Sequence, residues 1–386
     1  MIGALRQAAA SRAMTALPRA AEPIRFFVPG PAYVLEEVRE AMTAPVVGHR
    51  SAAFREVYAR VSAALPKVFR TGREVPVATA SSTLVMELAL ISTVRSSVLH
   101  LVCGSFSERW HAIAAALGRA ADRLDVPWGR AVDPDLVRRA LRRKRYEAVA
   151  VVHNETSTGV INALAEIART VREESDALVL VDTVSSLGGA PVETDAWELD
   201  WVLAGSQKAL AAPPGLAVFT LSERAEERAS RIEHRGWYTD ALRYLEEHRA
   251  GGPISTPAVP VVYALDRQLQ RIAAEGMEVR WARHARLRDR VARWLDGPGA
   301  ELGFAFASEA LAAEPEIRSP TVSCLQAPPG LPAPDLVRRL AGRGFTLGGG
   351  YAAWKESTFR IGHMGEVGDE DLEDLLGAIE EAVRVG

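Results

Sequence analysis

The chain has few lysines, few cysteines and no long apolar run, although it spans 386 residues. Its two cysteines, Cys103 and Cys324, lack CxxC or zinc-like spacing, which predicts structural thiols in a reducing compartment and no metal site. No apolar run approaches the ~20 residues that cross a bilayer. A net charge of −3 gives no reason to expect nucleic acid or a membrane as a partner. We therefore expect a cytoplasmic protein.

The first 21 residues are rich in alanine and arginine and precede the first acidic residue, Glu22. Their composition resembles a transit peptide, but they lack the apolar stretch of a secretory signal. We therefore predict that residues 1–25 form a flexible arm or an arm that wraps around a partner. The chain as a whole is 48% hydrophobic and 25% charged, which is the composition of a globular protein with a full core.

Short apolar runs alternate with amphipathic stretches after the arm. Strands are predicted at 75–78, 98–102, 148–152, 177–181, 201–204 and 216–221, and helices at 84–93, 109–117 and 163–174. Because the runs are continuous in their apolar residues and helices separate them, they predict a mainly parallel sheet covered on both faces. We place this large domain at residues 26–262.

The chain changes character after the Gly- and Pro-rich stretch at 251–257. A long charged helix is predicted over 261–295, which Gly276 could break. Strands at 321–326 and 359–361 and helices at 334–342 and 369–385 then predict a smaller α/β domain, which we place at residues 263–386.

One lysine draws attention because the chain has only three others. Lys208 follows the predicted strand at 201–204 and precedes Pro213-Pro214-Gly215. A partly buried lysine can lose its proton and attack a carbonyl, whereas arginine stays charged. Lys208 therefore suggests a Schiff base, and with it pyridoxal phosphate. The alternative is a surface lysine in a loop.

Polar side chains follow other predicted strands, and ligands of α/β sheets gather at such strand ends. Ser81, Ser82 and Thr83 open a helix, where hydroxyl groups, backbone N–H groups and the helix dipole can form a phosphate seat. Plain helix capping is the alternative. Asp182 ends the apolar run at 177–181 and could hold a ring nitrogen protonated, or it could cap the next turn.

The segment His-Asn-Glu-Thr-Ser-Thr-Gly at 153–159 follows another predicted strand. Its histidine has no second metal ligand at a suitable spacing, so we expect a packing role for it. Thr156 could donate a hydrogen bond to a ring oxygen.

Two basic features lie outside these strand ends. Arg360 is flanked by apolar strand residues, and such an arginine is costly unless it pairs with an anion. Its planar guanidinium suits a substrate carboxylate, and an internal salt bridge is the alternative. His49 and Arg50 form a second basic pair, for which a solvated loop is the alternative.

Taken in order, these segments resemble the class V aminotransferases of pyridoxal phosphate fold type I, and most closely the alanine–glyoxylate and serine–glyoxylate (serine–pyruvate) group. The matching pieces are 29–31, 48–50, 153–159, 181–189, 205–215 and 359–365. Each is weak alone, but the ordered set is specific and covers nearly the whole chain past residue 25. The resemblance implies an α/β fold, with a mainly parallel seven-stranded sheet in the large domain and a smaller C-terminal domain.

The resemblance also implies a role for each matching residue. Lys208 would form the aldimine with the cofactor, Asp182 would pair with its pyridine nitrogen, and Arg360 would bind the substrate's α-carboxylate. The other implied cofactor contacts are Phe106 and Val184 on the ring faces, Thr156 at the ring hydroxyl, and Ser81, Ser82, Thr83 and Gln207 at the phosphate. Thr256 would reach the phosphate from the neighbouring subunit, so that a homodimer shares its active sites.

Two positions depart from the family pattern. The family commonly has Thr-Gly-Ser-Gly at the phosphate seat, where this chain has Ala80 and Ser82 in place of the glycines. Backbone donors survive that change, but the turn is less tight. Phe106 stands where many relatives carry tryptophan, which loosens the stacking on the cofactor.

The implied activity is a ping-pong transamination from a small amino acid, alanine or serine, to a 2-oxo acid, glyoxylate or pyruvate. Lys208 would move the proton between the substrate's Cα and the cofactor. A catalytically silent α/β binding protein is the alternative outside the enzymes. The joint presence of Lys208, Asp182 and Arg360 argues against it.

Two other enzyme classes are weighed against this one. In phosphoserine aminotransferases a His-Arg pair helps to bind the substrate phosphate, and His49-Arg50 could serve this purpose. A second such pair is missing, because Met364 follows His363. Cysteine desulfuration is disfavoured because Cys324 lacks a mobile loop of small residues.

Overall fold

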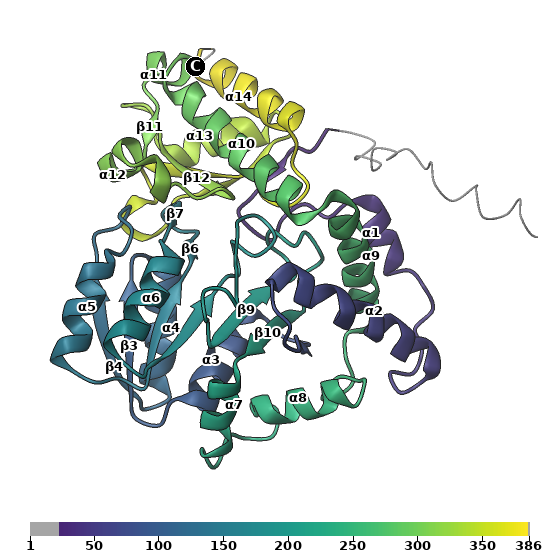
Figure 1. Ribbon diagram of the computed structural model, residues 1–386. Coiled ribbons are helices and arrows are strands. Elements are labelled where there is room, and N and C mark those ends of the chain that lie inside the picture. Colours follow the sequence, from purple (N-terminus) through teal and green to yellow (C-terminus); the bar gives the residue numbers. More distant parts are fainter. Residues whose placement is uncertain (1–22, 385–386) are drawn as a thin grey trace, which may run out of the picture.

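The computed structural model describes residues 23–384, so the predicted arm lies almost entirely outside the described residues. Two lobes are visible in Figure 1: a large one built on a seven-stranded sheet, and a smaller one, coloured green to yellow, that holds the C-terminal part of the chain. Within residues 23–384, no helix is long and apolar enough to cross a membrane.

The large sheet has the strand order β2-β10-β9-β8-β5-β3-β4. All pairings are parallel except the two that β10 makes. This confirms the predicted seven-stranded, mainly parallel sheet. The strands are β2 (Val77–Ala78), β3 (Ser97–Val102), β4 (Ala120–Asp125), β5 (Ala148–Val152), β8 (Leu178–Asp182), β9 (Trp201–Gly205) and β10 (Ala217–Leu221).

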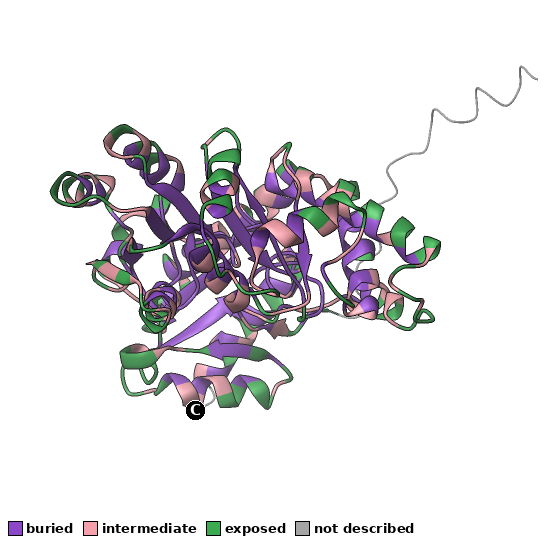
Figure 2. Ribbon diagram, turned by 90° about the horizontal axis from the view of Figure 1, so that it is seen from below, coloured by how far each residue is buried: buried purple, intermediate pink, exposed green. Residues whose placement is uncertain are grey.

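Helices cover both faces of this sheet, which is why β5 is apolar at every position and β8 is apolar up to its last residue, Asp182. In β8, Val179 and Val181 belong to one core cluster, whereas Leu178 and Leu180 belong to the other. The first cluster is completed by α2 (Ala52–Phe69), α5 (Pro134–Arg143), α6 (Leu164–Glu174) and α9 (Val259–Glu275). The second is completed by α3 (Ser82–Thr93), α4 (Ser105–Ala116), α7 (Glu223–Ser230) and α8 (Ala241–Arg249). Figure 2 shows the buried strands between helices with exposed outer faces.

The smaller lobe is built on a five-stranded sheet with the order β1-β13-β14-β12-β11. Its strands are β1 (Phe26–Phe27), β11 (Ala305–Phe306), β12 (Val322–Gln326), β13 (Thr346–Gly349) and β14 (Thr358–Gly362). Its helices are α10 (Met277–Leu295), α11 (Pro298–Glu301), α12 (Glu309–Ala313), α13 (Ala333–Ala341) and α14 (Asp369–Arg384), with 3-10 turns η1 (Pro315–Ile317) and η2 (Ala352–Trp354). The remaining elements are the helix α1 (Glu36–Ala41) and a hairpin of β6 (Asn154–Glu155) and β7 (Val160–Ile161).

The chain passes between the two lobes more than once. β1 pairs with β13, so residues near the start of the described chain belong to the second sheet. The long charged helix expected over 261–295 is two helices, α9 and α10, separated at Gly276, whose φ of +83° favours glycine. The proposed division between residues 262 and 263 falls within α9 and remains a prediction.

The segment at 28–29 packs closely on β14, and this contact can be tested. A Cβ at Gly362 would lie 2.7 Å from backbone atoms of Val28 and Pro29. Gly362→Ala is therefore expected to lower the free energy of unfolding by about 1–3 kcal/mol, measured by urea denaturation. Gly377→Ala is the control: nothing lies within 4 Å of its Cβ, and it should gain up to about 1 kcal/mol of helix stability. Unchanged stability of Gly362→Ala would contradict the contact.

Candidate active site

Lys208 lies in the turn that follows β9, where its side chain is only 9% exposed. Its Nζ donates a hydrogen bond to the carbonyl oxygen of Pro29. The next residue, Gly30, has a φ of +110°, and a Cβ there would lie within 2.6 Å of the Lys208 side chain. Burial, supported by the positive charge of Arg360, lowers the pKa of Lys208 to about 8. A lysine in this state supplies a neutral amine near neutral pH.

Asp182 is the last residue of β8 and is also buried. Among the described residues, its side chain accepts one hydrogen bond, from the backbone N–H of Val184 at 2.7 Å. Burial raises the pKa of Asp182 to about 7, and the nearby Glu155 adds to the effect. The positive charges of Lys208 and Arg109 oppose the shift without cancelling it. The carboxylate thus lacks a cationic partner of its own.

The two segments predicted to hold a phosphate meet at Gly205, the last residue of β9. A Cβ at Gly205 would lie 2.4 Å from Ser82 Oγ and 2.6 Å from Gln207 Oε1, so these two side chains converge there. Ser82 Oγ is buried and has no hydrogen-bond partner in the part of the chain that the structure describes. Ser81, the N-cap residue of α3, makes no side-chain capping bond, and Thr83 lies in the first turn. Capping, the alternative for these hydroxyl groups, does not occupy Ser81 or Ser82.

Three more of the predicted residues surround Lys208 and Asp182. Lys208 Nζ lies 5.6 Å from the centre of the Phe106 ring, at the start of α4. Val184 is half-buried two residues beyond Asp182. Thr156 is buried, and its hydroxyl group is hydrogen-bonded to that of Ser185.

Arg360 reaches this site from β14, in the other sheet, and is 8% exposed. Its Nε donates to Gly349 O at 2.8 Å and its Nη1 to Thr156 O at 3.2 Å, while its guanidinium lies 4.6 Å from the centre of the Tyr351 ring. These bonds use two of its five N–H groups. No carboxylate of the described residues forms an ion pair with it, which removes the salt-bridge alternative. Burial lowers the pKa of Arg360.

His49, Arg50 and Thr256 do not join Lys208 within this chain. They line a separate surface pocket, together with Trp237 and the Gly- and Pro-rich stretch at 251–256. Their predicted roles therefore depend on a second subunit.

Sequence reasoning missed Glu155, which organises one wall of the site. The Glu155 carboxylate is fully buried. It accepts hydrogen bonds from backbone N–H groups of Phe106, Ser107 and Ser157 and from both serine hydroxyls. It thereby satisfies the N-terminus of α4 and fixes Phe106. The segment at 153–159 had been considered only for its histidine and Thr156.

Two further residues were missed. Asn154 is buried, and neither its Oδ1 nor its Nδ2 has a hydrogen-bond partner. A buried amide without a partner costs free energy, which is typical of a group that faces a ligand. Tyr351, whose ring centre lies 5.9 Å from that of Phe106, closes the space beside Arg360.

Comparison with known proteins identifies the family. The profile of aminotransferase class V matches residues 78–301. The chain belongs to the class V aminotransferases. It is 38% identical to an uncharacterized aminotransferase of Methanocaldococcus jannaschii over 92% of each chain. It is 33% identical to a serine–glyoxylate aminotransferase of Methylorubrum extorquens, over 92% of this chain and 88% of the relative.

Solved structures agree with this assignment. An alanine–glyoxylate aminotransferase from Nostoc sp. superposes with a TM-score of 0.86 at 30% identity, covering 95% of this chain and 97% of the other. Phosphoserine aminotransferases are more distant, at 25% identity for one from Cytophaga hutchinsonii. The chain is therefore an enzyme that transfers amino groups, and pyridoxal phosphate is the cofactor of its family.

The unbalanced charge of Asp182 predicts a pH-dependent stability. Its pKa in the folded protein, about 7, exceeds the unfolded value of 3.8, so the folded state binds this proton more tightly and loses stability as pH rises from about 4 to 7. Asp182→Asn should therefore stabilise the cofactor-free protein at pH 8, by roughly 2–4 kcal/mol in urea denaturation. The gain should fade as pH falls toward 4. A gain that is equal at pH 5 and pH 8 would show that the carboxylate is not the cause.

Proposed function

We propose that this class V aminotransferase transfers the amino group of alanine or serine to glyoxylate or pyruvate, with pyridoxal phosphate bound at Lys208. One observation carries the proposal: Lys208, Asp182 and Arg360 are buried together, and none of them forms an ion pair with any residue that the structure describes. Three such charges are costly unless a ligand supplies their complements. A protonated ring nitrogen would pair with Asp182 and a substrate carboxylate with Arg360, while Lys208 would react as a neutral amine with an aldehyde.

The residues present fit this cofactor. Lys208 would bind its aldehyde carbon and Asp182 its ring nitrogen. The partnerless Ser82 Oγ, with Gln207 and the neighbouring Ser81 and Thr83, would hold the phosphate at the start of α3. Phe106 and Val184 would contact the ring faces, and Thr156 the ring hydroxyl. When bound, the cofactor supplies an electron-withdrawing ring that stabilises negative charge at the substrate's Cα.

The chain's own residues would bind and orient the amino acid. Arg360 has free N–H groups for a bidentate pair with the α-carboxylate. Lys208 Nζ, with its lowered pKa of about 8, can accept the proton from the substrate's Cα and would deliver it to the cofactor. Asp182 would keep its negative charge opposite the ring nitrogen. Burial of all three excludes water from the proton transfer.

Further observations support the choice of small substrates and the proposed homodimer. Some of the relatives named for glyoxylate are named for serine or alanine, and others for L-aspartate or (S)-ureidoglycine. The small donors are favoured because Tyr351 and Phe106 narrow the space beside Arg360. We propose a homodimer in which Thr256 reaches the phosphate of the neighbouring subunit. The exposed pocket that Thr256 lines is available for such a contact. Two buried free cysteines support a cytoplasmic location.

Phosphoserine is the second candidate substrate. His49 and Arg50 share the pocket of Thr256, so a dimer that brings Thr256 to a neighbouring active site would bring this basic pair along. Against this candidate, the position after His363 is Met364, so a second basic pair is missing there.

The absorption of the purified protein tests the cofactor and the substrate together. The wild type should show a visible band after incubation with pyridoxal phosphate, and Lys208→Ala should lack the band of the lysine-bound form. Alanine or serine should bleach the wild-type band, and glyoxylate or pyruvate should restore it. A protein that stays colourless would contradict the enzyme proposal. A band that responds only to phosphoserine and glutamate would favour the second candidate.

Arg360→Met should separate binding of the carboxylate from the chemistry. The variant should lose about 100-fold in kcat/KM for alanine, because a charge-assisted bidentate pair is worth about 3 kcal/mol in a buried site. Ethylamine, which has no carboxylate, should bleach the band of wild type and variant at similar slow rates. An equal loss with both amines would mean that Arg360 does not bind the carboxylate.

A further inference from the structure

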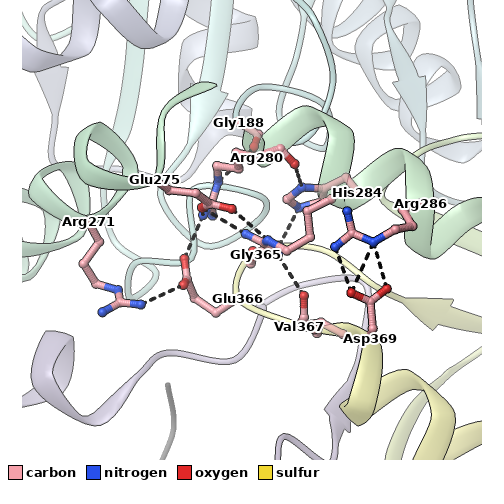
Figure 3. Close-up of polar contacts among 12 residues, drawn as sticks. Gly188, Arg271, Glu275, Arg280, His284, Arg286, Gly365, Glu366, Val367 and Asp369 are labelled. Carbon is pink, nitrogen blue, oxygen red and sulfur yellow. Dashed lines mark hydrogen bonds and ion pairs between the residues drawn. The ribbon is translucent and has the colours of Figure 1, made fainter. Parts of the chain in front are cut away.

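A buried arginine outside the proposed binding site is bonded to three loops of that site. Arg280 lies on α10, and its side chain is 0% exposed. Its Nε donates to Gly188 O at 3.0 Å and its Nη2 to Ala209 O at 2.9 Å. Its Nη1 donates to Glu275 at 2.7 Å and to Glu366 at 2.9 Å. Figure 3 shows this guanidinium between the turn at Gly188 and the acidic side chains.

Three of the four contacts, those with Gly188, Ala209 and Glu366, lie a short distance along the chain from a proposed catalytic or binding residue. Ala209 directly follows Lys208, and Gly188 belongs to the turn that follows Asp182 and β8. Glu366 lies in the segment that leaves β14 after Arg360. The Arg280 guanidinium thus forms hydrogen bonds to segments that follow strands of both sheets. In the proposed function, Lys208 and Arg360 beside these segments contact the same substrate.

The segment around Glu366 is held from several directions. Arg283 Nη1 donates to Gly365 O at 3.0 Å and to Val367 O at 2.7 Å, and His284 Nε2 accepts from Gly365 N at 3.1 Å (Figure 3). A Cβ at Gly365 would lie 2.9 Å from the Cβ of Ala211, in the turn that carries Lys208. The two segments therefore touch, and α10 fixes the contact.

In the cluster around Arg280, each charged side chain forms an ion pair with one of opposite charge, unlike the charged side chains of the proposed binding site. Burial alone would raise the pKa of Glu366, but the positive charges of Arg280, Arg283 and Arg271 lower it to about 2. Gln268 also donates to Glu366, at 2.7 Å. Balanced buried ion pairs contribute little net stability compared with apolar side chains of similar size. Stability alone is thus a weak reason for this arrangement.

We propose that Arg280 is a positioning residue for the transamination: it fixes the Lys208 segment against the segment that follows Arg360. The inference rests on the proposed function. The amine of Lys208 and the guanidinium of Arg360 must keep the separation between Cα and carboxylate of one amino acid, and a misplacement of about 1 Å can cost about 100-fold in rate. Arginine suits this task because its planar fork directs donors to several acceptors at once, whereas lysine offers a single point of charge.

The double variant Arg280→Met/Glu366→Gln tests the proposal, because it removes the guanidinium together with one of its carboxylate partners, so that the buried cluster loses one charge of each sign. Its unfolding midpoint should stay near that of the wild type. Hydrogen exchange of the holoenzyme should accelerate about tenfold or more in both segments 205–215 and 362–368. The rate of the alanine half-reaction at saturation should fall about tenfold or more. Exchange that rises only in α10, or a rate within twofold of wild type, would overturn the proposal.

Arg280→Lys is the second variant, and it keeps the charge if the double variant fails to fold. It should fold, accelerate exchange in the same two segments and lower the half-reaction rate; wild-type exchange and rate would overturn the proposal. Arg286→Gln is the matched control on the same helix, since Arg286 pairs with Asp369 at the surface (Figure 3). It should change neither segment. Exchange of the cofactor-free proteins tests Arg280 even if the wild type fails to transaminate, so the two failures are distinguishable.

Discussion

The structure depends on burying Lys208, Asp182 and Arg360 at one place, where none of them forms an ion pair within residues 23–384. Desolvation lowers the pKa of the amine and raises that of the carboxylate, so both titrate closer to neutral pH than free side chains do. Such a site is stable only if the surroundings hold it in place. The strands β5, β8 and β9, in which Asp182 at the end of β8 is the one charged residue, supply that rigidity from one side, and the small sheet supplies it from the other.

The fold was predictable where burial on both faces produces a continuous apolar run. The run at 177–181 predicted β8, and the structure shifts it by only one residue. Two of the missed elements were missed for different reasons. β4 is an edge strand with Asp122, Arg123 and Asp125 in it, and it forms by pairing with β3, which its local sequence does not encode. α5 is amphipathic and starts with an Asp133 cap followed by Pro134, so its sequence does contain helix signals, although it contains no continuous apolar run.

In the site, the residues at strand ends were predictable because parallel strands place their carboxyl ends at one edge of the sheet. Glu155 was not, because its partners at the start of α4 lie far from it in the sequence. The same carboxylate explains why α4 begins at Ser105, before the helix predicted over 109–117. Arg280 was hidden for another reason. It belongs to a helix with many arginines, and only the tertiary structure shows that this one is buried.

The protein has two kinds of buried charge: ion pairs that position loops, and charges without an ion pair that are available to a ligand. Arg280 and Glu366 satisfy each other, so ligand binding need not change their charge, and they can hold the loops in a fixed place. Lys208, Asp182 and Arg360 form no ion pair among the described residues. A ligand that supplies groups to pair or react with them therefore binds favourably. Substrate specificity then depends on residues outside both sets. Phe106 and Tyr351 would limit the size of a substrate in the proposed function, whereas the basic pair considered for a phosphate, His49-Arg50, lies in the pocket of Thr256. Substrate choice would then be a property of the assembled dimer, because a single chain does not bring that pair to its own Lys208.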